Sequence, residues 1–363
     1  MLKTANSQRG VALLTILLLV VSITVVAGAM LASQKIVIRR SGLLFNQNQL
    51  LQDINAGQQL AATVIRADSK LNDTNSAQDI WAKPLPPYTL GTHTITAEIR
   101  DESSRFNINN LYNNGAIDEA ALAFFQRLLT QLNLDPEIAV AVLDWQDTDS
   151  EVYNDGGNES TVYASQGNSS DSPLPNQPFT TVEQLIEVRG VDLEVLATLQ
   201  PFVTAIPFYL PINMNTASPT VLGALIEGGS AEQMRSLVEL REQNVLETVD
   251  DLWQLPAFSV VSAEQRTALT PLLAIDSQAF MALITATDGT TDGAAKQRFA
   301  TVLISSTRIG NEGAASNTAN SNSNNANDNA NNSPNTNNVA DNNQSDKEVK
   351  VIAQRLWAFR PRF

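Results

Sequence analysis

The stretch RGVALLTILLLVVSITVVAGAMLA, residues 9–32, decides how the rest of the chain is interpreted. After its opening arginine it contains no charged residue, and the uncharged run continues to Gln34. As a helix, residues 11–32 span about 33 Å, enough to cross a hydrocarbon core of about 30 Å. Basic residues flank the run on both sides: Lys3 and Arg9 before it, and Lys35, Arg39 and Arg40 after it. The short basic leader favours a cytoplasmic amino terminus, so we expect one membrane helix with the bulk of the chain beyond it.

Three kinds of processing compete at this segment. A cleaved secretory signal would use Ala27–Ala29 as its small-residue site, but its apolar region is longer than the usual 7–15 residues. A plain signal anchor would stay uncut. The third interpretation explains why Arg9-Gly10 abuts the apolar run without a spacer. This junction resembles the prepilin-type leader, which prepilin peptidase cuts after the glycine.

The resemblance to prepilins has two consequences at the new amino terminus. It implies cleavage between Gly10 and Val11 and N-methylation of Val11. Most pilins and pseudopilins carry a glutamate five residues after the cut, where it pairs with the amino terminus of a neighbouring subunit. Here that position is Thr15, which argues against an ordinary repeating subunit.

Composition excludes most enzyme classes. Of 363 residues 43% are apolar, which is enough for a real core. The 38 acids and 23 bases give a formal charge of −15, which is unfavourable for binding nucleic acid. Because there is no cysteine, the chain has no disulfide, zinc–thiolate or thiol chemistry. The single histidine, His93, excludes sites with two imidazoles, and we expect it to be a solvent-facing strand residue.

Hydrophobic periodicity predicts an α+β protein in which a long amino-terminal helix packs on a small antiparallel sheet. Apolar residues continue at helical spacing to Ile65, and no proline occurs before Pro84. Four β-rich segments predict the strands: residues 93–100, 280–287, 298–309 and 350–359. Between the first and the second, eight helical segments predict an inserted all-α domain: residues 120–132, 136–143, 182–188, 193–199, 219–226, 231–241, 249–255 and 263–273.

The domain boundaries follow from this pattern. They are 1–10 for the leader, 11–66 for the membrane-spanning and soluble helix, 67–110 and 277–363 for the sheet, and 111–276 for the inserted domain. Within the sheet region, residues 311–346 differ in composition, because Ser316–Asp346 contains 14 asparagines in 31 residues. Such a stretch cannot bury a core, and we expect a flexible connection there.

An acidic loop is the candidate metal site. Six acids fall within 16 residues, and no lysine or arginine occurs between residues 128 and 188. Hard oxygen ligands without imidazole or thiolate suit Ca²⁺, although the register is not that of an EF-hand. A solvated loop and a paired-carboxylate hydrolase are the alternatives. The candidate ligands are Asp144, Asp147, Asp149, Glu151, Asp155 and Glu159.

Two segments resemble helix–hairpin–helix motifs: residues 182–199, with Gly190 in the turn, and residues 212–255. Such motifs often bind DNA phosphates at a helix amino terminus. That alternative is a membrane-anchored DNA-binding protein of the competence type. Charge opposes it, because residues 179–276 contain 13 acids and 4 bases, a net charge of −9. A compact packing unit is the simpler interpretation.

Taken together, these features resemble general secretion pathway protein K, the family of large minor pseudopilins of type II secretion. The resemblance rests on five stretches of sequence: the leader at 9–20, SSRFNINNL at 103–111, LDWQDTDSE at 143–151, TTVEQLIEVRGV at 180–191 and INMNTASPTVLGALI at 212–226. The asparagine-rich tract is a departure from the family pattern.

The resemblance implies a pseudopilin fold with an inserted α-helical domain, and a non-enzymatic function in the export of folded proteins. The protein would sit at the tip of a periplasmic filament and start its assembly, with the minor pseudopilins I and J as direct partners. It would be anchored in the inner membrane of a Gram-negative cell and meet prepilin peptidase and the inner-membrane assembly platform. It also implies calcium in the inserted domain, which we place at the acidic loop. Thr15 suits a tip subunit, since no neighbour above it presents an amino terminus.

Overall fold

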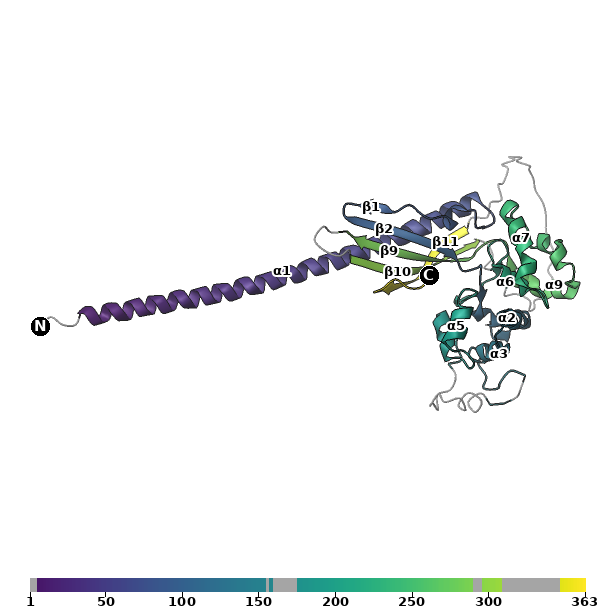
Figure 1. Cartoon of the computed structure of the whole chain (residues 1–363), viewed down its shortest axis with the longest axis horizontal. Helices are drawn as coiled ribbons and strands as arrows, with labels where there is room; N and C mark the ends of the chain where they lie inside the picture. Colours follow the sequence, from purple (N-terminus) through teal and green to yellow (C-terminus); the bar gives the residue numbers. More distant parts are fainter. Residues whose placement is uncertain (1–4, 155–156, 159–174, 290–295, 309–346) are drawn as a thin grey trace, which may run out of the picture.

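The computed structural model shows a long helix, a sheet and a helical domain in succession (Figure 1). It describes residues 5–154, 157–158, 175–289, 296–308 and 347–363. The expected flexible connection at 311–346 lies outside these residues, as do Asp155 and Glu159 of the acidic loop. The inserted domain lies at the end of the sheet remote from the amino terminus (Figure 1).

Helix α1 runs without interruption from Ala5 to Leu71. Its 67 residues correspond to about 100 Å. Residues 11–45 are exposed throughout, and buried residues begin at Leu50. Among the described residues, α1 is the one helix long and apolar enough to cross a membrane. The helix extends five residues past the expected end at 66, and Lys70 in its last turn complements the carboxyl end of the helix dipole.

The sheet has five antiparallel strands in the order β1-β2-β9-β10-β11. Strands β2 and β9 are neighbours in the sheet although the inserted domain separates them in sequence. Asp101 at the end of β2 is paired with Phe280 at the start of β9. A β-bulge interrupts the pairing of β10 with β11 between Leu303 and Ile304. The strands are β1 (Tyr88–Leu90), β2 (His93–Asp101), β9 (Ala279–Asp288), β10 (Lys296–Arg308) and β11 (Lys347–Trp357).

The soluble half of α1 packs on one face of this sheet. Ile54, Ala61 and Ile65 form a core with alternate residues of the strands, such as Ile284. Gly57 makes the closest approach, since a Cβ there would lie within contact distance of side-chain atoms of Ile284 and Ile95. The alternation that predicted the strands places their apolar side chains against the helix.

His93 corrects one expectation from the sequence. It does not simply face solvent: its Nδ1 lies 2.7 Å from Oδ2 of Asp53 on α1, and its Nε2 lies 3.8 Å from Oδ1 of Asp288 on β9. Both aspartates are buried. His93 therefore joins α1 to the sheet, at the end of the sheet nearer the membrane helix.

The inserted domain has its own hydrophobic core. Phe106, Phe124 and Phe125 stack at its centre, with ring centroids 5.0 and 5.2 Å apart. Because Phe106 and Ile108 belong to this core, the domain starts before residue 111. Side-chain caps begin most of its helices. In the part of the chain that the structure describes, the α-helices of this domain are α2 (Glu119–Gln131), α3 (Glu137–Asp144), α5 (Leu193–Leu199), α6 (Pro219–Gly223), α7 (Ala231–Gln243), α8 (Val249–Trp253) and α9 (Ala263–Leu269).

Short elements complete the two units. The 3₁₀ helices are Ile80–Ala82, Ile108–Leu111, Val182–Glu187, Pro256–Phe258 and Thr270–Leu272. Three two-stranded ladders pair β3 (Phe106–Asn107) with β6 (Val203–Thr204), β4 (Tyr112–Asn113) with β5 (Ala116–Ile117), and β7 (Ile212–Asn213) with β8 (Leu273–Ala274).

Buried asparagines fix the irregular backbone of the inserted domain. The Asn107 amide nitrogen donates to the carbonyl oxygens of Ile206 and Phe208, and its Oδ1 accepts from the Ile206 N–H. Asn110 bonds both backbone groups of Leu210. These contacts satisfy backbone groups that no helix or ladder pairs. The asparagines of residues 107–110 therefore hold the backbone of residues 206–210 in place.

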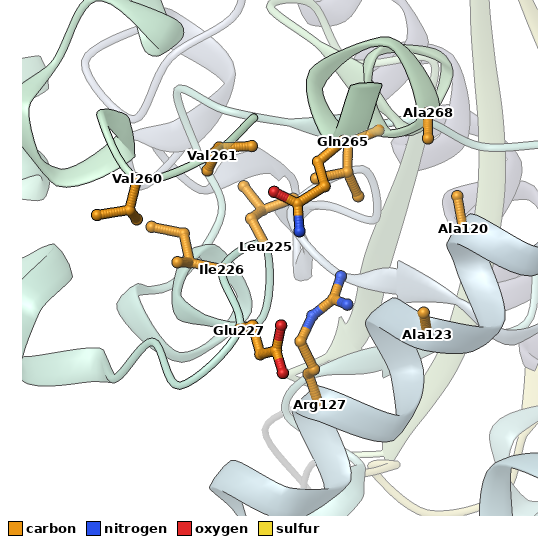
Figure 2. Close-up of a pocket in the computed structure, with 11 residues that line it drawn as sticks. Ala120, Ala123, Arg127, Leu225, Ile226, Glu227, Val260, Val261, Gln265 and Ala268 are labelled. Atoms are coloured by element: carbon orange, nitrogen blue, oxygen red, sulfur yellow. The ribbon is translucent and has the colours of Figure 1, made fainter. Parts of the chain in front are cut away.

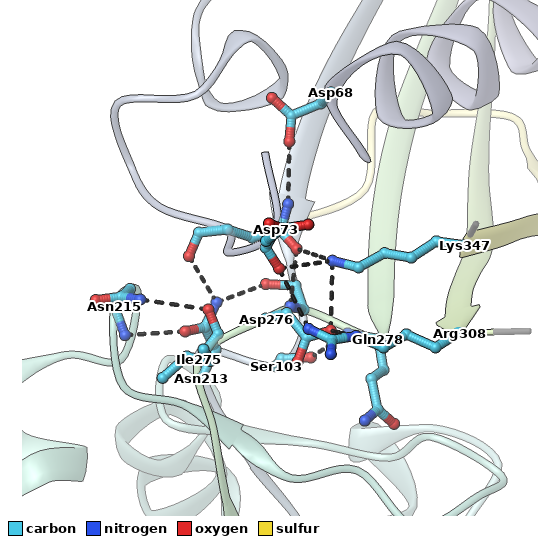
Figure 3. A network of polar contacts seen from close by, with 12 residues as sticks. Asp68, Asp73, Ser103, Asn213, Asn215, Ile275, Asp276, Gln278, Arg308 and Lys347 are labelled. Atoms are coloured by element: carbon cyan, nitrogen blue, oxygen red, sulfur yellow. Dashed lines mark hydrogen bonds and ion pairs between the residues drawn. The ribbon is translucent and has the colours of Figure 1, made fainter. Parts of the chain in front are cut away.

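A polar network joins the inserted domain to the sheet (Figure 3). Asn213 donates to the carbonyl oxygen of Asn75 at 2.9 Å and to Oγ of Ser277 at 2.8 Å. Beside it, Asp276 pairs with Lys347 at 3.3 Å and with Arg308 at 3.4 Å. The inserted domain is therefore bonded to both the end of α1 and the sheet.

Candidate functional site

The acidic loop follows helix α3, whose last residue is Asp144. Asp144 is fully buried, and its Oδ1 accepts the backbone N–H of Tyr153 at 3.1 Å, nine residues further along the chain. Tyr153 in turn donates its hydroxyl to Glu119 on α2. The loop therefore folds back on α3, as its glycines and asparagines allow.

Asp147 has the most unusual environment in the loop. Its side chain is buried, and its Oδ1 has no hydrogen-bond partner. Burial, together with the nearby Asp149 and Asp144 carboxylates, raises the pKa of Asp147 to about 7. An unpaired buried carboxylate is costly, and a bound cation is one way to compensate for it.

The remaining predicted ligands are arranged less closely. Asp149 and Glu151 are exposed, and the Asp149 carboxylate accepts the Glu151 N–H at 2.8 Å. Asp155 and Glu159 lie outside the described residues. Within the part of the chain that the structure describes, no three acidic or imidazole side chains are grouped to hold a metal ion. The structure thus brings together Asp144 and Asp147, and places Asp149 near enough to Asp147 to affect its charge.

The two hairpin-like segments pack into the inserted domain. Residues 182–187 form a 3₁₀ helix, not an α-helix. Gly190 adopts φ +81°, and a Cβ there would meet Ile138 of α3 at 3.2 Å. In the second segment Arg241 donates to the carbonyl oxygen of Met214 at 2.7 Å. These contacts give both segments a packing function.

The predicted processing junction, between Gly10 and Val11, lies within α1. Residues 5–10 continue the helix without a break into the apolar segment. Val11 is exposed, and the Thr15 hydroxyl bonds back to the carbonyl oxygen of Ala12 at 2.9 Å. The Thr15 hydroxyl is thus bonded within its own helix, and the side chain lacks the negative charge of the usual glutamate.

Two family models describe the inserted domain, both as type II secretion system (T2SS), protein K. They match residues 104–208 and 212–276. A curated type II secretion system protein K from Pseudomonas aeruginosa is 30% identical over 259 residues, covering 68% of this chain and 76% of that protein. The chain belongs to the type II secretion system protein K family. The homologue from Klebsiella pneumoniae, also 30% identical, extends the match to 76% of this chain and 87% of that protein.

A solved structure shares the fold of this chain. It is the GspK–GspI–GspJ complex from enterotoxigenic Escherichia coli, matched with a TM-score of 0.66 at 20% identity, over 88% of this chain and 99% of that chain. The pseudopilin arrangement expected from the sequence is therefore confirmed. Membership of the family makes the protein a minor pseudopilin of type II secretion, and nothing favours the DNA-binding alternative.

Proposed function

We propose that this protein caps the tip of the type II pseudopilus, where it binds the minor pseudopilins I and J and starts filament assembly without catalysing a reaction. The observation that carries the proposal is the position of the inserted domain, at the end of the sheet remote from the membrane helix (Figure 1). A domain there obstructs the addition of another subunit above. Thr15 supports the same position, because a tip subunit has no amino terminus above it to neutralise.

The position of an antibody label on isolated filaments tests the tip position. Filaments are sheared from cells that carry the full chain with an epitope after Phe363, and labelled with gold-conjugated antibody. We expect label at one end only. The control is Thr15→Glu, which restores the usual carboxylate. Because the inserted domain still obstructs addition, this variant should also stay at one end. Label along the filament shaft in the unmodified protein would contradict the proposal.

Processing and location follow from the same proposal. Prepilin peptidase would cleave after Gly10, leaving N-methylated Val11 at the start of an inner-membrane helix, with the sheet and the inserted domain in the periplasm. On this proposal, the inner-membrane assembly platform is a further partner of the protein. The mass of the amino-terminal peptide from membrane-extracted protein tests this directly. Methyl-valine at residue 11 is expected, and a chain that begins near residue 30 would show an ordinary secreted protein.

We propose Ca²⁺ as the structural ion of the acidic loop. Asp147, which is buried and whose Oδ1 has no hydrogen-bond partner, and the nearby Asp144 fit a cation, and oxygen donors without sulfur or imidazole fit calcium in particular. When bound, calcium would supply the positive charge that the loop lacks and hold it against α3. The remaining oxygens would come from the other acids predicted in the loop, from backbone or from water.

Calorimetry of the full chain in detergent tests the ion. After chelation, adding CaCl₂ should raise the unfolding temperature, while equimolar MgCl₂ should raise it less. Asp147→Asn should remove most of the calcium response, and the matched control Glu239→Gln, an exposed acid on α7, should keep it. Equal responses in the two variants would contradict a site at Asp147.

A further inference from the structure

A cavity of about 370 Å³ lies where the two matched parts of the inserted domain meet. Helix α2 forms one wall, and the turn after α6 together with α9 forms the other (Figure 2). Its lining is mainly aliphatic and includes Ala123, Leu225, Val261 and Leu269. Such a volume accepts a small side chain with its backbone, and apolar walls disfavour a strongly hydrated ligand.

Two hydrogen-bond donors converge in this apolar space. The Nε of Arg127 donates to the carbonyl oxygen of Ala224 at 2.6 Å, and this bond orients the rest of the guanidinium into the cavity (Figure 2). Gln265 has its Oε1 occupied by the backbone N–H of Ser262 at 2.9 Å. Its amide nitrogen therefore points across the cavity toward Arg127 (Figure 2). A guanidinium and an amide N–H₂ that face one gap are complementary to a carboxylate.

Charge limits the class of ligand further. Burial lowers the pKa of Arg127 and the nearby Glu227 partly offsets this, so the guanidinium stays positive. Glu227 is exposed, and its carboxylate lies beside the Arg127 side chain (Figure 2). One cation, one amide and a nearby acid suit a singly charged anion better than a phosphate. The surrounding aliphatic walls suit an apolar group next to that anion.

We propose that this cavity binds a partner polypeptide through an aliphatic side chain adjacent to a carboxylate, with Arg127 and Gln265 holding the carboxylate. The carboxylate is either a chain terminus or an acidic side chain. Because α2 and α9 come from different halves of the inserted domain, an occupant contacts both halves and braces them together. The site is independent of the acidic loop and of the tip position proposed above.

Peptide binding to the full chain in detergent tests the site by isothermal titration calorimetry. The probes are acetyl-Gly-Gly-Leu as the free acid, the same peptide as the carboxyl-terminal amide, and acetyl-Gly-Leu-Asp amide. We expect saturable binding of at least one of the two acidic peptides, with the neutral amide about tenfold weaker or more, because charge-assisted hydrogen bonds are lost. The stronger acidic peptide identifies the source of the carboxylate.

Two variants link the binding to these residues. Arg127→Gln should remove the preference for acid over amide. Gln265→Glu should weaken acid binding while its carboxylate still accepts the Ser262 N–H, so the start of α9 is preserved. Arg235→Gln, an exposed cation on α7 that pairs with Glu232, is the matched control and should bind like the unmodified protein. Absence of saturable acid binding, equal binding of acid and amide, or the same loss in the control would overturn the proposal.

Discussion

Gly57 should be indispensable for the docking of α1 on the sheet. A Cβ at this position would lie far inside van der Waals contact of Cγ2 of Ile284, and 3.0 Å from Cγ2 of Ile95. Both contacts are with β-branched side chains of the sheet, which have little rotational freedom. In Gly57→Ala, overpacking as severe as this costs about 2–3 kcal/mol, and the helix propensity of alanine returns about 1 kcal/mol. We expect a net loss of about 1–2 kcal/mol in the free energy that opens the helix–sheet contact.

Hydrogen exchange of the full chain in detergent, followed by mass spectrometry, measures this opening locally. Peptides from β2 and β9 should exchange faster in Gly57→Ala, and peptides from the inserted domain should not change, because its core is separate. Gly42→Ala is the matched control on the same helix, since a Cβ there meets nothing within 4 Å. It should leave exchange in the sheet unchanged.

A double-mutant cycle with Ile284→Ala gives the decisive comparison. Alone, Ile284→Ala leaves a cavity and should cost about 2–5 kcal/mol. In combination with Gly57→Ala, the new methyl group enters that cavity. The double variant should then be more stable than the sum of the two losses predicts, by about 1 kcal/mol or more. Additive losses, or no loss in Gly57→Ala, would refute the idea that close approach at Gly57 sets the packing.

Three further outcomes follow from substitutions elsewhere in the chain. Burial is the main reason why the pKa of Asp101 is raised to about 6. Because the folded state holds this proton more tightly than the unfolded state, Asp101 lowers the free energy of unfolding as pH rises from about 4 to about 6. Asp101→Asn should remove up to about 3 kcal/mol of this pH dependence, measured by urea unfolding at both pH values. His93→Gln leaves Asp53 and Asp288 buried without the imidazole, and should cost about 1.5–3 kcal/mol and speed exchange in the α1 segment near residue 53. Gly190→Ala forces φ +81° on a residue with a Cβ and should cost about 1–2 kcal/mol by thermal unfolding, while unchanged stability would show that the turn can relax.

Local periodicity was enough to predict the long helix and the four long strands, but not the three-residue edge strand β1 (Tyr88–Leu90). The alternation in residues 93–100 predicted β2 and the apolar run with the helical spacing up to Ile65 predicted α1, because β2 and the soluble half of α1 each bury one face while the amino-terminal half of α1 is continuously apolar. Predictions weakened where periodicity ended. The last turn of α1 is polar, and the six residues from Val182 bury too narrow a stripe to separate a 3₁₀ helix from an α-helix.

Contacts between residues distant in the chain could not be predicted from the sequence. The alternation of residues could place His93 on a face of its strand. It could not predict that Asp53 of α1, 40 residues earlier in the chain, contacts it there. The same limit applies to the cavity, whose two donors, Arg127 and Gln265, are 138 residues apart in the sequence and carry no local signature. In the acidic loop the residue types indicated calcium chemistry. Only the fold shows that Asp147 is buried and unpaired while Asp149 is exposed.

The position of the insertion explains how one chain combines a filament fold with a bulky domain. Asp101 and Phe280 are direct partners on adjacent antiparallel strands, so the two ends of the insertion lie about 5 Å apart. A hairpin turn would close the same gap, and the sheet therefore keeps its register whatever the length of the connection. The inserted domain buries its own core and bonds back to the sheet through Asn213 and Asp276. The connection is at the end of the sheet remote from the membrane helix, so the helix and the sheet keep the fold of a pseudopilin, and in the tip position proposed above the added domain would lie in the path of the next subunit.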